Sequence, residues 1–413
     1  MAPMPRPSQR VGAAMHTSRR NIFLLSCCQA LLLINTSSLI SMNALIGYGL
    51  VANKAFASVG ATTYVLGSAA ATMPASLWMA RVGRRRGFMM GSVIAIVGSV
   101  VAAFSLWIGS FALFCAGTAI IGVYTAFGLQ YRFAAAEIAS PAFKAKAISL
   151  VLAGGIVGGI LGPEASRWAR NWFAQPFLGS FLLLAIVAVV ALLVQSQVRV
   201  PAPTLAERGG DGRTLRQIVG QPVFVVAALS AALGYGLMNL LMTATPLAMS
   251  FCSHPYSAAA FVIEWHVVGM YGPGFFTGTL IDRFGALKVI VAGTVLMSLC
   301  AFVALSGITV MHFVIALVLL GVGWNFMYTG GTTLLTESYR PAEKAKTQGA
   351  NDFIVFAVMG LSSFSSGALV SAAGWEWMNA AVLPVLVVVA GAALWLSWLR
   401  HARHQVSGIR GPV

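Results

Sequence analysis

Two short motifs each occur twice in this chain. The first begins at Ser76 (SLWMARVGRRR) and is repeated at Gly278 (GTLIDRFGALK), and the second begins at Glu137 (EIASPAFKAK) and is repeated at Glu337 (ESYRPAEKAK). Both repeats lie about 200 residues after the first copies, and self-similarity at a fixed offset is the signature of a duplicated unit. The chain therefore consists of two related halves.

Both motifs are basic segments that separate long apolar runs. Hydrophobic residues make up 58% of the chain and charged residues only 9%, a balance that a soluble domain with a polar surface does not reach. The net charge of +16 is spread over short segments between apolar runs, so the positive-inside rule explains it better than nucleic-acid binding does. The sequence predicts a membrane protein with many spans and no nucleic-acid partner.

The lengths of the apolar runs predict the fold class. A membrane-spanning helix needs about 20 predominantly apolar residues, and by this rule the chain is an all-α membrane protein whose twelve transmembrane helices form two pseudo-symmetric six-helix bundles. The expected helices cover residues 22–47, 57–79, 88–107, 111–133, 147–166, 176–195, 223–250, 257–280, 288–307, 309–333, 348–371 and 378–399.

Polar segments define the expected domain boundaries. Residues 1–20 are rich in Pro and Arg and are expected to form a disordered cytoplasmic tail. Residues 197–222 combine Pro and Gly with mixed charges, which predicts a cytoplasmic linker. The two six-helix bundles then span residues 21–196 and 223–399, and a cytoplasmic tail follows at 400–413.

Basic residues are distributed unevenly between the two sides of the membrane. If the N-terminus is cytoplasmic, only Lys54, Arg167 and Arg170 among the Lys and Arg residues lie clearly outside. Because Lys and Arg concentrate in cytoplasmic loops, we expect both termini to be cytoplasmic, in a multi-pass protein of the cell inner or plasma membrane.

The first repeated motif resembles the gate motif of the major facilitator superfamily. The pattern of that family, Gly-x-x-x-Asp-Arg-x-Gly, lies between the second and third helices and again between the eighth and ninth. The second copy in this chain matches it through Gly278, Asp282, Arg283 and Gly285, whereas the first copy has Ala80 at the position of the Asp. The resemblance implies the twelve-helix fold of this family and secondary transport.

The resemblance also implies that these charges latch the two bundles together on the cytoplasmic side. An acid at the inner end of one helix can lie against the N-terminus of another and pair with an Arg. Because Ala80 replaces the acid in the first copy, Glu137 is the nearest candidate partner of Arg81, and the arginines at 84–86 either join the latch or only anchor the topology. The expected cytoplasmic gate residues are Arg81, Glu137, Asp282, Arg283 and Glu337.

In this family the first, fourth, seventh and tenth helices line the central cavity, and here they carry amide and aromatic side chains. Amides can bind a polar solute and aromatic rings can stack on it, although hydrogen bonding between helices is the alternative for each of them. Arg132 either reaches the membrane surface or binds an anionic group. As a set these residues favour a mostly uncharged, partly aromatic solute. The candidate substrate-binding residues are Asn35, Tyr124, Gln130, Arg132, Tyr235, Asn239, Trp324, Asn325 and Tyr328.

Three ionisable residues within predicted spans are candidates for proton coupling. Ionisable groups at membrane depth are costly and usually functional, which indicates Glu264 and Asp352, and His266 lies beside the first. The alternatives are a structural pairing for Glu264 and helix N-terminal capping for Asp352.

These features predict a secondary active transporter that works by alternating access of the two duplicated bundles, with a proton as the coupling ion. Uptake of an uncharged or heteroaromatic, vitamin-like metabolite is slightly favoured. Proton-coupled efflux of drugs or metabolites is the alternative, and a non-transporting membrane sensor, an assembly factor or a lipid flippase represents a different class. No nucleotide-binding loop, catalytic triad spacing or metal-ligand spacing occurs, so we expect no enzyme activity, no cofactor and no metal, and a monomer.

Overall fold

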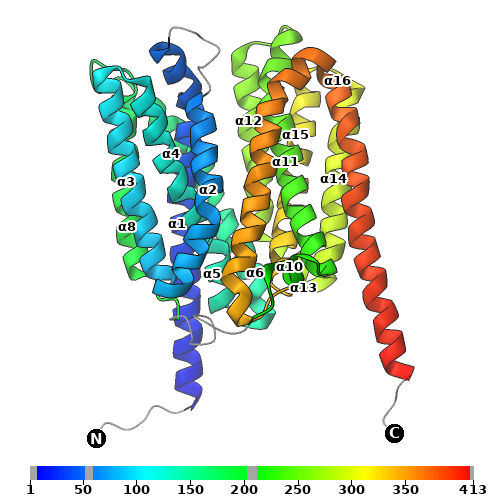
Figure 1. Ribbon diagram of the computed structural model, residues 1–413. Helices are drawn as coiled ribbons and strands as arrows, with labels where there is room; N and C mark the ends of the chain where they lie inside the picture. The colour runs from blue at the N-terminus through cyan, green and yellow to red at the C-terminus, as the bar shows by residue number, and fades with distance from the viewer. Residues whose placement is uncertain (1–6, 52–58, 202–211, 410–413) are drawn as a thin grey trace, which may run out of the picture. The chain divides into compact units, whose positions relative to one another are not determined.

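The computed structural model describes residues 7–51, 59–201 and 212–409, and every element within these residues is an α-helix or a short 3-10 helix (Figure 1). The chain divides into two compact units, with the boundary between Thr204 and Leu205. Each unit is a bundle of long helices joined by short connections.

Unit 1 contains the helices of the first half. Two of its predicted spans are interrupted: the fourth is divided into α4 and α5, and the fifth into α6 and α7. The helices are α1 (Pro7–Leu50), α2 (Val59–Val82), α3 (Arg84–Ile108), α4 (Phe111–Gly128), α5 (Tyr131–Ile138), η2 (Pro141–Phe143), α6 (Lys144–Ala153), α7 (Gly155–Ala169) and α8 (Leu178–Gln197).

Unit 2 repeats this plan with a single long element at its end. The backbone of α16 is non-helical at Gly374, which has φ 82° and ψ 169°, so α16 consists of two spans separated by a kink. The helices are α10 (Leu215–Val219), α11 (Pro222–Phe251), α12 (Tyr256–Tyr271), η3 (Gly272–Phe275), α13 (Thr277–Phe284), α14 (Ala286–Ser306), α15 (Val310–Leu335), η4 (Pro341–Glu343) and α16 (Lys344–Ile409).

The prediction of an all-α membrane protein is confirmed. Nine helices within the described residues are long and apolar enough to cross a membrane. The other three predicted spans fall on α2, on α12 with α13, and on the first part of α16. Since a bilayer offers no partner for a free backbone amide, a chain of this hydropathy satisfies its backbone within helices.

The segment predicted as an N-terminal tail, residues 1–20, includes the start of α1. Residues 1–6 lie outside the described residues, but α1 already begins at Pro7 and continues into the first span. Proline is tolerated at the first position of a helix, and no other proline interrupts the sequence before Leu50. At the other end α16 continues to Ile409, so most of the predicted C-terminal tail is also helical.

Within unit 1, glycines allow α7 to pack closely against α1. A Cβ atom at Gly158 would lie 2.2 Å from the carbonyl oxygen of Ala30. Ser37 Oγ donates a hydrogen bond to the Gly158 carbonyl at 2.9 Å, and Ser38 Oγ donates one to the Gly162 carbonyl at 2.6 Å. Small residues at a helix contact bring two backbones together in this way in membranes.

The segment after α8 is held against the start of the first span. Asn21 Nδ2 donates to the carbonyl oxygen of Arg199 at 2.7 Å, and the Arg199 amide donates to Asn21 Oδ1 at 3.0 Å. One asparagine side chain thus satisfies both backbone groups of Arg199, which fixes the end of unit 1.

Candidate functional site

Four aromatic rings form one cluster in unit 2. Trp324 and Tyr328, one turn apart on α15, are stacked with ring centroids 5.2 Å apart and an interplanar angle of 14°. Tyr235 from α11 lies edge-on to both, at 5.4 Å from each centroid. Tyr271 at the end of α12 lies edge-on to Trp324 at 5.7 Å. Three of the candidate substrate-binding residues are therefore brought together, and Tyr271 joins them.

Three of the four rings are buried, and the fourth is more exposed than the others. Trp324 and Tyr328 are each 2% exposed and Tyr271 is 6% exposed, whereas Tyr235 is half-buried. A flat solute needs about 7 Å between two rings to enter between them, twice the usual aromatic contact distance, so the 5.2 Å separation of Trp324 and Tyr328 leaves no such space. The accessible side of the cluster is therefore that of Tyr235.

The two candidate amides of unit 2 bind neighbouring helices. Asn325 accepts a hydrogen bond from Thr277 Oγ1 at 2.7 Å and donates from Nδ2 to the Met270 carbonyl at 2.7 Å. Asn239 Nδ2 donates to Ser362 Oγ at 3.1 Å. Asn325 therefore makes hydrogen bonds between helices, which was the alternative to substrate binding. The hydrogen bond of Asn239 connects α11 to α16.

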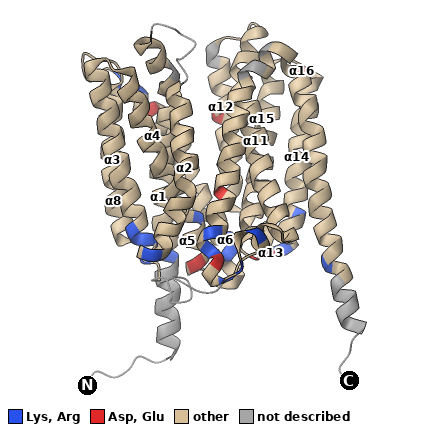
Figure 2. Ribbon diagram, in the orientation of Figure 1, with Lys and Arg blue, Asp and Glu red and all other residues tan. Residues whose placement is uncertain are grey.

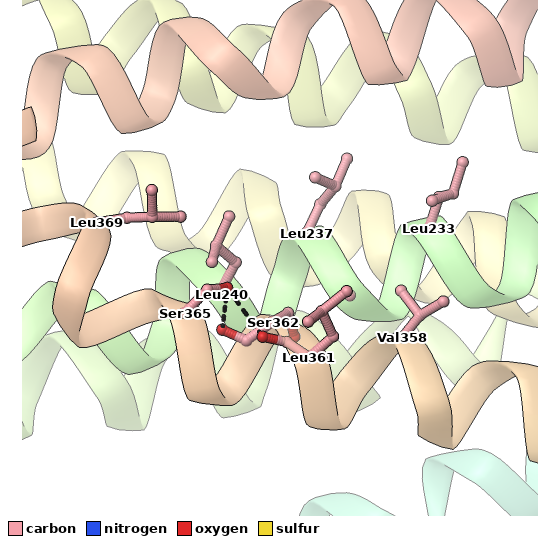
Figure 3. Close-up of a pocket in the computed structure, with 9 residues that line it drawn as sticks. Leu233, Leu237, Leu240, Val358, Leu361, Ser362, Ser365 and Leu369 are labelled. Carbon is pink, nitrogen blue, oxygen red and sulfur yellow. Dashed lines mark hydrogen bonds between the residues drawn. The ribbon is translucent and has the colours of Figure 1, made fainter.

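A groove between α11 and α16 lies on a different side of α11 from the aromatic cluster. It has a volume of ≈ 160 Å³, and Figure 3 shows that leucine side chains of both helices line it. The hydroxyls of Ser362 and Ser365 donate to carbonyls of their own helix at 2.8 Å. Tyr235 is two residues from Leu233 and from Leu237, and residues two apart point to different sides of a helix. The groove is apolar and separate from the ring cluster.

Two candidates of unit 1 are part of its packed interior. Tyr124 is 1% exposed and lies in the hydrophobic core with Leu32 and Phe127. Asn35 is fully buried, and its Nδ2 donates to the Leu184 carbonyl of α8 at 3.2 Å. Both residues therefore hold helices of unit 1 together.

The ion pair at the end of unit 1 differs from the prediction. Glu137 pairs with Arg84, with 2.6 Å between Arg84 Nη2 and Glu137 Oε1, and Arg84 Nη1 donates to Gln130 Oε1 at 2.8 Å. Arg81 is exposed at the end of α2. The prediction that Glu137 pairs with Arg81 is wrong because Arg84, at the first position of α3, points into the bundle and is only 7% exposed. Gln130 is part of this polar contact.

Arg132 lies inside unit 1. It is 2% exposed at the start of α5, and its guanidinium carbon lies 4.7 Å from the centroid of the Phe133 ring. The prediction that its side chain extends to the membrane surface is wrong, because α5 begins a new helical segment that turns this residue inward.

The three ionisable candidates within spans have different surroundings. Glu264 on α12 is exposed. His266 is fully buried, and its Nδ1 lies 2.7 Å from the Leu317 carbonyl of α15, which as an acceptor requires the proton on Nδ1. Asp352 is 1% exposed, and Asn351 Nδ2 donates to its Oδ1 at 3.1 Å. The capping interpretation of Asp352 is wrong, because α16 begins at Lys344 and has no acid in its first turn.

The three gate candidates of unit 2 lie together at one end of that unit. Asp282 and Arg283 are exposed at the end of α13. Glu337, which follows α15, accepts a hydrogen bond from Arg400 at 2.8 Å. Figure 2 shows that Lys and Arg of unit 2 gather at this end, and in unit 1 at the end where α3 begins.

Comparison with known proteins identifies the family. The sequence profile of the Major Facilitator Superfamily matches residues 25–272 and 267–411. The chain belongs to the major facilitator superfamily.

Curated relatives within this superfamily are similar along almost the whole chain. The riboflavin transporter RfnT of Brucella anthropi is 39% identical over 375 residues, which cover 90% of this chain and 94% of that protein. The uncharacterized MFS-type transporter YdeG of Bacillus subtilis is 29% identical over 85% of each chain. This superfamily member is therefore a membrane-embedded secondary transporter of a small molecule, not an enzyme.

Solved structures of superfamily transporters share the fold. The fucose transporter FucP of E. coli superposes with a TM-score of 0.72 at 13% identity, covering 90% of this chain and 98% of that one. The human organic anion transporter MFSD10 superposes with a TM-score of 0.71 at 14% identity, covering 91% and 99%. At these identities the comparison concerns the fold alone.

An ion pair that the sequence did not predict lies at the start of unit 2. Arg213, which precedes α10, donates from Nε to Glu343 Oε1 at 2.8 Å and from Nη2 to Glu343 Oε2 at 2.5 Å. Its amide also donates to Glu343 Oε1 at 2.8 Å, and Lys346 Nζ donates to the Arg213 carbonyl. We call this set of contacts the Arg213 clamp.

The Arg213 clamp changes the acidity of a fully buried carboxyl group. Hydrogen bonds from Arg213 lower the pKa of Glu343 from 4.5 to about 2, because they stabilise the charged form. The repeat contained a signal for this residue: Glu343 stands where the first copy has Phe143. An acid that appears in only one copy of a repeated motif is a candidate for a contact that only one half makes.

Proposed function

We propose that this transporter takes up riboflavin or a closely similar flavin. The observation that carries the proposal is the 39% identity with the riboflavin transporter RfnT over 94% of that protein. The aromatic cluster of unit 2 is consistent with it, because a flat heteroaromatic ring gains area and stacking energy against Tyr and Trp rings.

Four finer features belong to the same proposal. We propose that transport is coupled to protons and that the protein acts as a monomer. We also propose that it lies in the cell inner membrane with both termini in the cytoplasm. The exposed charges around Asp282 and Arg283 form part of a cytoplasmic gate in this proposal. Support for the orientation comes from the gathering of Lys and Arg at one end of each unit (Figure 2), because Lys and Arg concentrate on the cytoplasmic side.

The test uses a bacterial host that can neither synthesise nor import riboflavin. Expression of the chain should restore growth on low riboflavin and give saturable uptake of the labelled vitamin. Tyr235→Ala should lower the uptake about 5- to 150-fold, since stacking and burial of one ring contribute roughly 1 to 3 kcal/mol, whereas Tyr235→Phe should retain most of it.

A matched control separates binding from general damage. Trp398 is 66% exposed on α16, so Trp398→Ala removes an aromatic ring of the same unit without touching the cluster, and uptake should be unchanged. If the wild-type chain supports neither growth nor uptake although it is present in the membrane, the proposal is wrong.

A further inference from the structure

Three buried polar groups of α15 have no hydrogen-bond partner within the described residues. These are the indole Nε1 of Trp324 and the hydroxyls of Thr329 and Thr332, and the three residues are 2%, 0% and 1% exposed. Buried polar groups in native proteins are nearly always hydrogen-bonded, and each exception requires an explanation. Threonine in a helix can bond the carbonyl one turn back, as Thr333 does to Thr329 at 2.9 Å, but Thr332 does not.

Two of these residues, Trp324 and Thr332, lie one turn before and one turn after Tyr328 on α15. Trp324, Tyr328 and Thr332 are spaced four residues apart, and residues at this spacing follow one side of a helix. Eight residues of helix span about 12 Å. Along this side of α15 the order of side chains is therefore the indole of Trp324 with its N–H donor, the ring of Tyr328, and the hydroxyl of Thr332.

Neighbouring polar groups on α15 are already satisfied or point elsewhere. Both ends of the Asn325 amide are used by Thr277 and Met270. Thr329 also has an unpartnered hydroxyl, but it follows Tyr328 directly and so points about 100° away from it. Trp324 and Thr332 are the two unsatisfied groups that follow the side of the aromatic cluster.

We infer that Trp324 Nε1 and Thr332 Oγ1 recognise the two polar parts of the transported solute, the first an acceptor on the aromatic ring and the second a hydroxylated side chain. The inference rests on the proposed function. A flavin carries carbonyl oxygens on one end of its tricyclic ring and a polyol chain on the ring system, so it offers an acceptor for the indole N–H and hydroxyls for Thr332. A site built to hydrogen-bond a substrate group rejects an analogue that lacks this group, because its own buried group is then left unpaired.

The experiment compares riboflavin with lumichrome, which has a similar tricyclic ring without the polyol chain. Thr332→Val keeps the shape and removes the hydroxyl, so it should raise the KM for riboflavin about tenfold and leave inhibition by lumichrome unchanged. Replacing Trp324 by benzothienylalanine, in which sulfur replaces the N–H, should weaken riboflavin and lumichrome equally, by about tenfold. Thr329→Val, which removes a buried hydroxyl on another side of α15, should change neither value.

Each variant is normalised to its amount in the membrane, and ligand-induced thermal stabilisation of the purified protein provides a second measurement. If Thr332→Val leaves the KM for riboflavin within twofold of the wild type, or weakens riboflavin and lumichrome equally, the hydroxyl has only a structural role and the inference is wrong. If the replacement of Trp324 leaves the binding of riboflavin and of lumichrome unchanged, the indole N–H has only a structural role and the inference is wrong for this group. Failure of the wild-type chain to transport riboflavin would instead overturn the proposed function, and the inference with it.

Discussion

Asp352 is a carboxyl group buried within a membrane span, and at the scale of single residues it is the strongest candidate for a proton carrier. Ionisable groups at membrane depth are costly and usually functional, and a group that gains and loses a proton there can couple a gradient to a conformational change. Glu264, by contrast, is exposed.

We predict that Asp352→Asn abolishes accumulation of the solute against its gradient but leaves exchange of labelled for unlabelled solute within about threefold of the wild type. Accumulation and exchange are measured in the same vesicles, with and without a proton gradient. Glu376→Gln, which alters an exposed acid of the same unit, is the control. Normal accumulation by Asp352→Asn, together with loss in Glu264→Gln, would assign the proton to Glu264.

Glu343 gives a second prediction at this scale, through the pH dependence of stability. Its pKa is about 2 in the folded chain and 4.5 ordinarily, so its contribution to stability is fully present above pH 4.5 and is lost as the pH falls toward 2. Glu343→Gln leaves Arg213 without its carboxylate and should lower the midpoint of thermal unfolding at pH 7 by about 5 °C.

The variant should also show a smaller loss of stability than the wild type between pH 5 and pH 3, because it lacks the group that titrates. Unfolding of the detergent-purified protein, followed by tryptophan fluorescence, measures both effects. An unchanged midpoint at pH 7 would mean that the Arg213 clamp contributes nothing measurable.

At the scale of elements, Gly374 separates the two spans of α16. Its φ of 82° and ψ of 169° lie in a region that is accessible essentially only to glycine. A Cβ atom there would meet nothing within 4 Å, and the same is true of Gly391, which lies within the second, helical part of α16. The two positions differ in backbone conformation and not in available space.

Gly374→Ala should therefore destabilise the protein by about 1 to 3 kcal/mol. Gly391→Ala should stabilise it slightly, by up to about 1 kcal/mol, because alanine favours the helix. Urea unfolding of the two variants in the same detergent tests this pair. Equal stabilities would show that the kink does not depend on the glycine.

The sequence predicted helices better than their interruptions. Apolar runs of sufficient length identify a span regardless of its neighbours, so all twelve predicted spans coincide with helices. The break between α6 and α7 coincides with a close contact to another helix. Gly154, for example, lies at a junction where a Cβ would be 2.3 Å from the Ser26 carbonyl of α1, and no local pattern reveals such a contact.

The candidate site was predictable in the same uneven way. Tyr235, Trp324 and Tyr328 followed from the expected cavity-lining helices, and they do form one cluster. Tyr271 lies at a helix end and was not expected there. The partner of Glu137 depended on the direction in which Arg84 leaves the first turn of α3, which sequence spacing does not determine.

At the scale of the whole molecule, the proposed gate predicts a change in the balance between two conformations. Asp282 is exposed at the end of α13, and exposed charge pairs contribute up to about 1 kcal/mol. Asp282→Asn should therefore change the labelling rate of a reporter cysteine about two- to fivefold.

The reporter is Asn239→Cys in a chain whose five native cysteines are replaced by serine, and labelling is measured with a membrane-impermeant thiol reagent added from either side. Lys288→Gln, at the start of α14, tests whether the loss of any charge near this motif has the same effect. An unchanged rate in Asp282→Asn would reduce the motif to an anchor of membrane topology.

The anchoring of the connecting segment has a consequence for how the protein can be cut and rejoined. Asn21 fastens Arg199 to unit 1, and Glu343 fastens Arg213 to unit 2, so neither bundle needs the intervening peptide to hold its own end in place. Two genes that each encode one half, divided near residue 204, should yield polypeptides that assemble into a working carrier. The carrier should also tolerate a foreign protein inserted at that point.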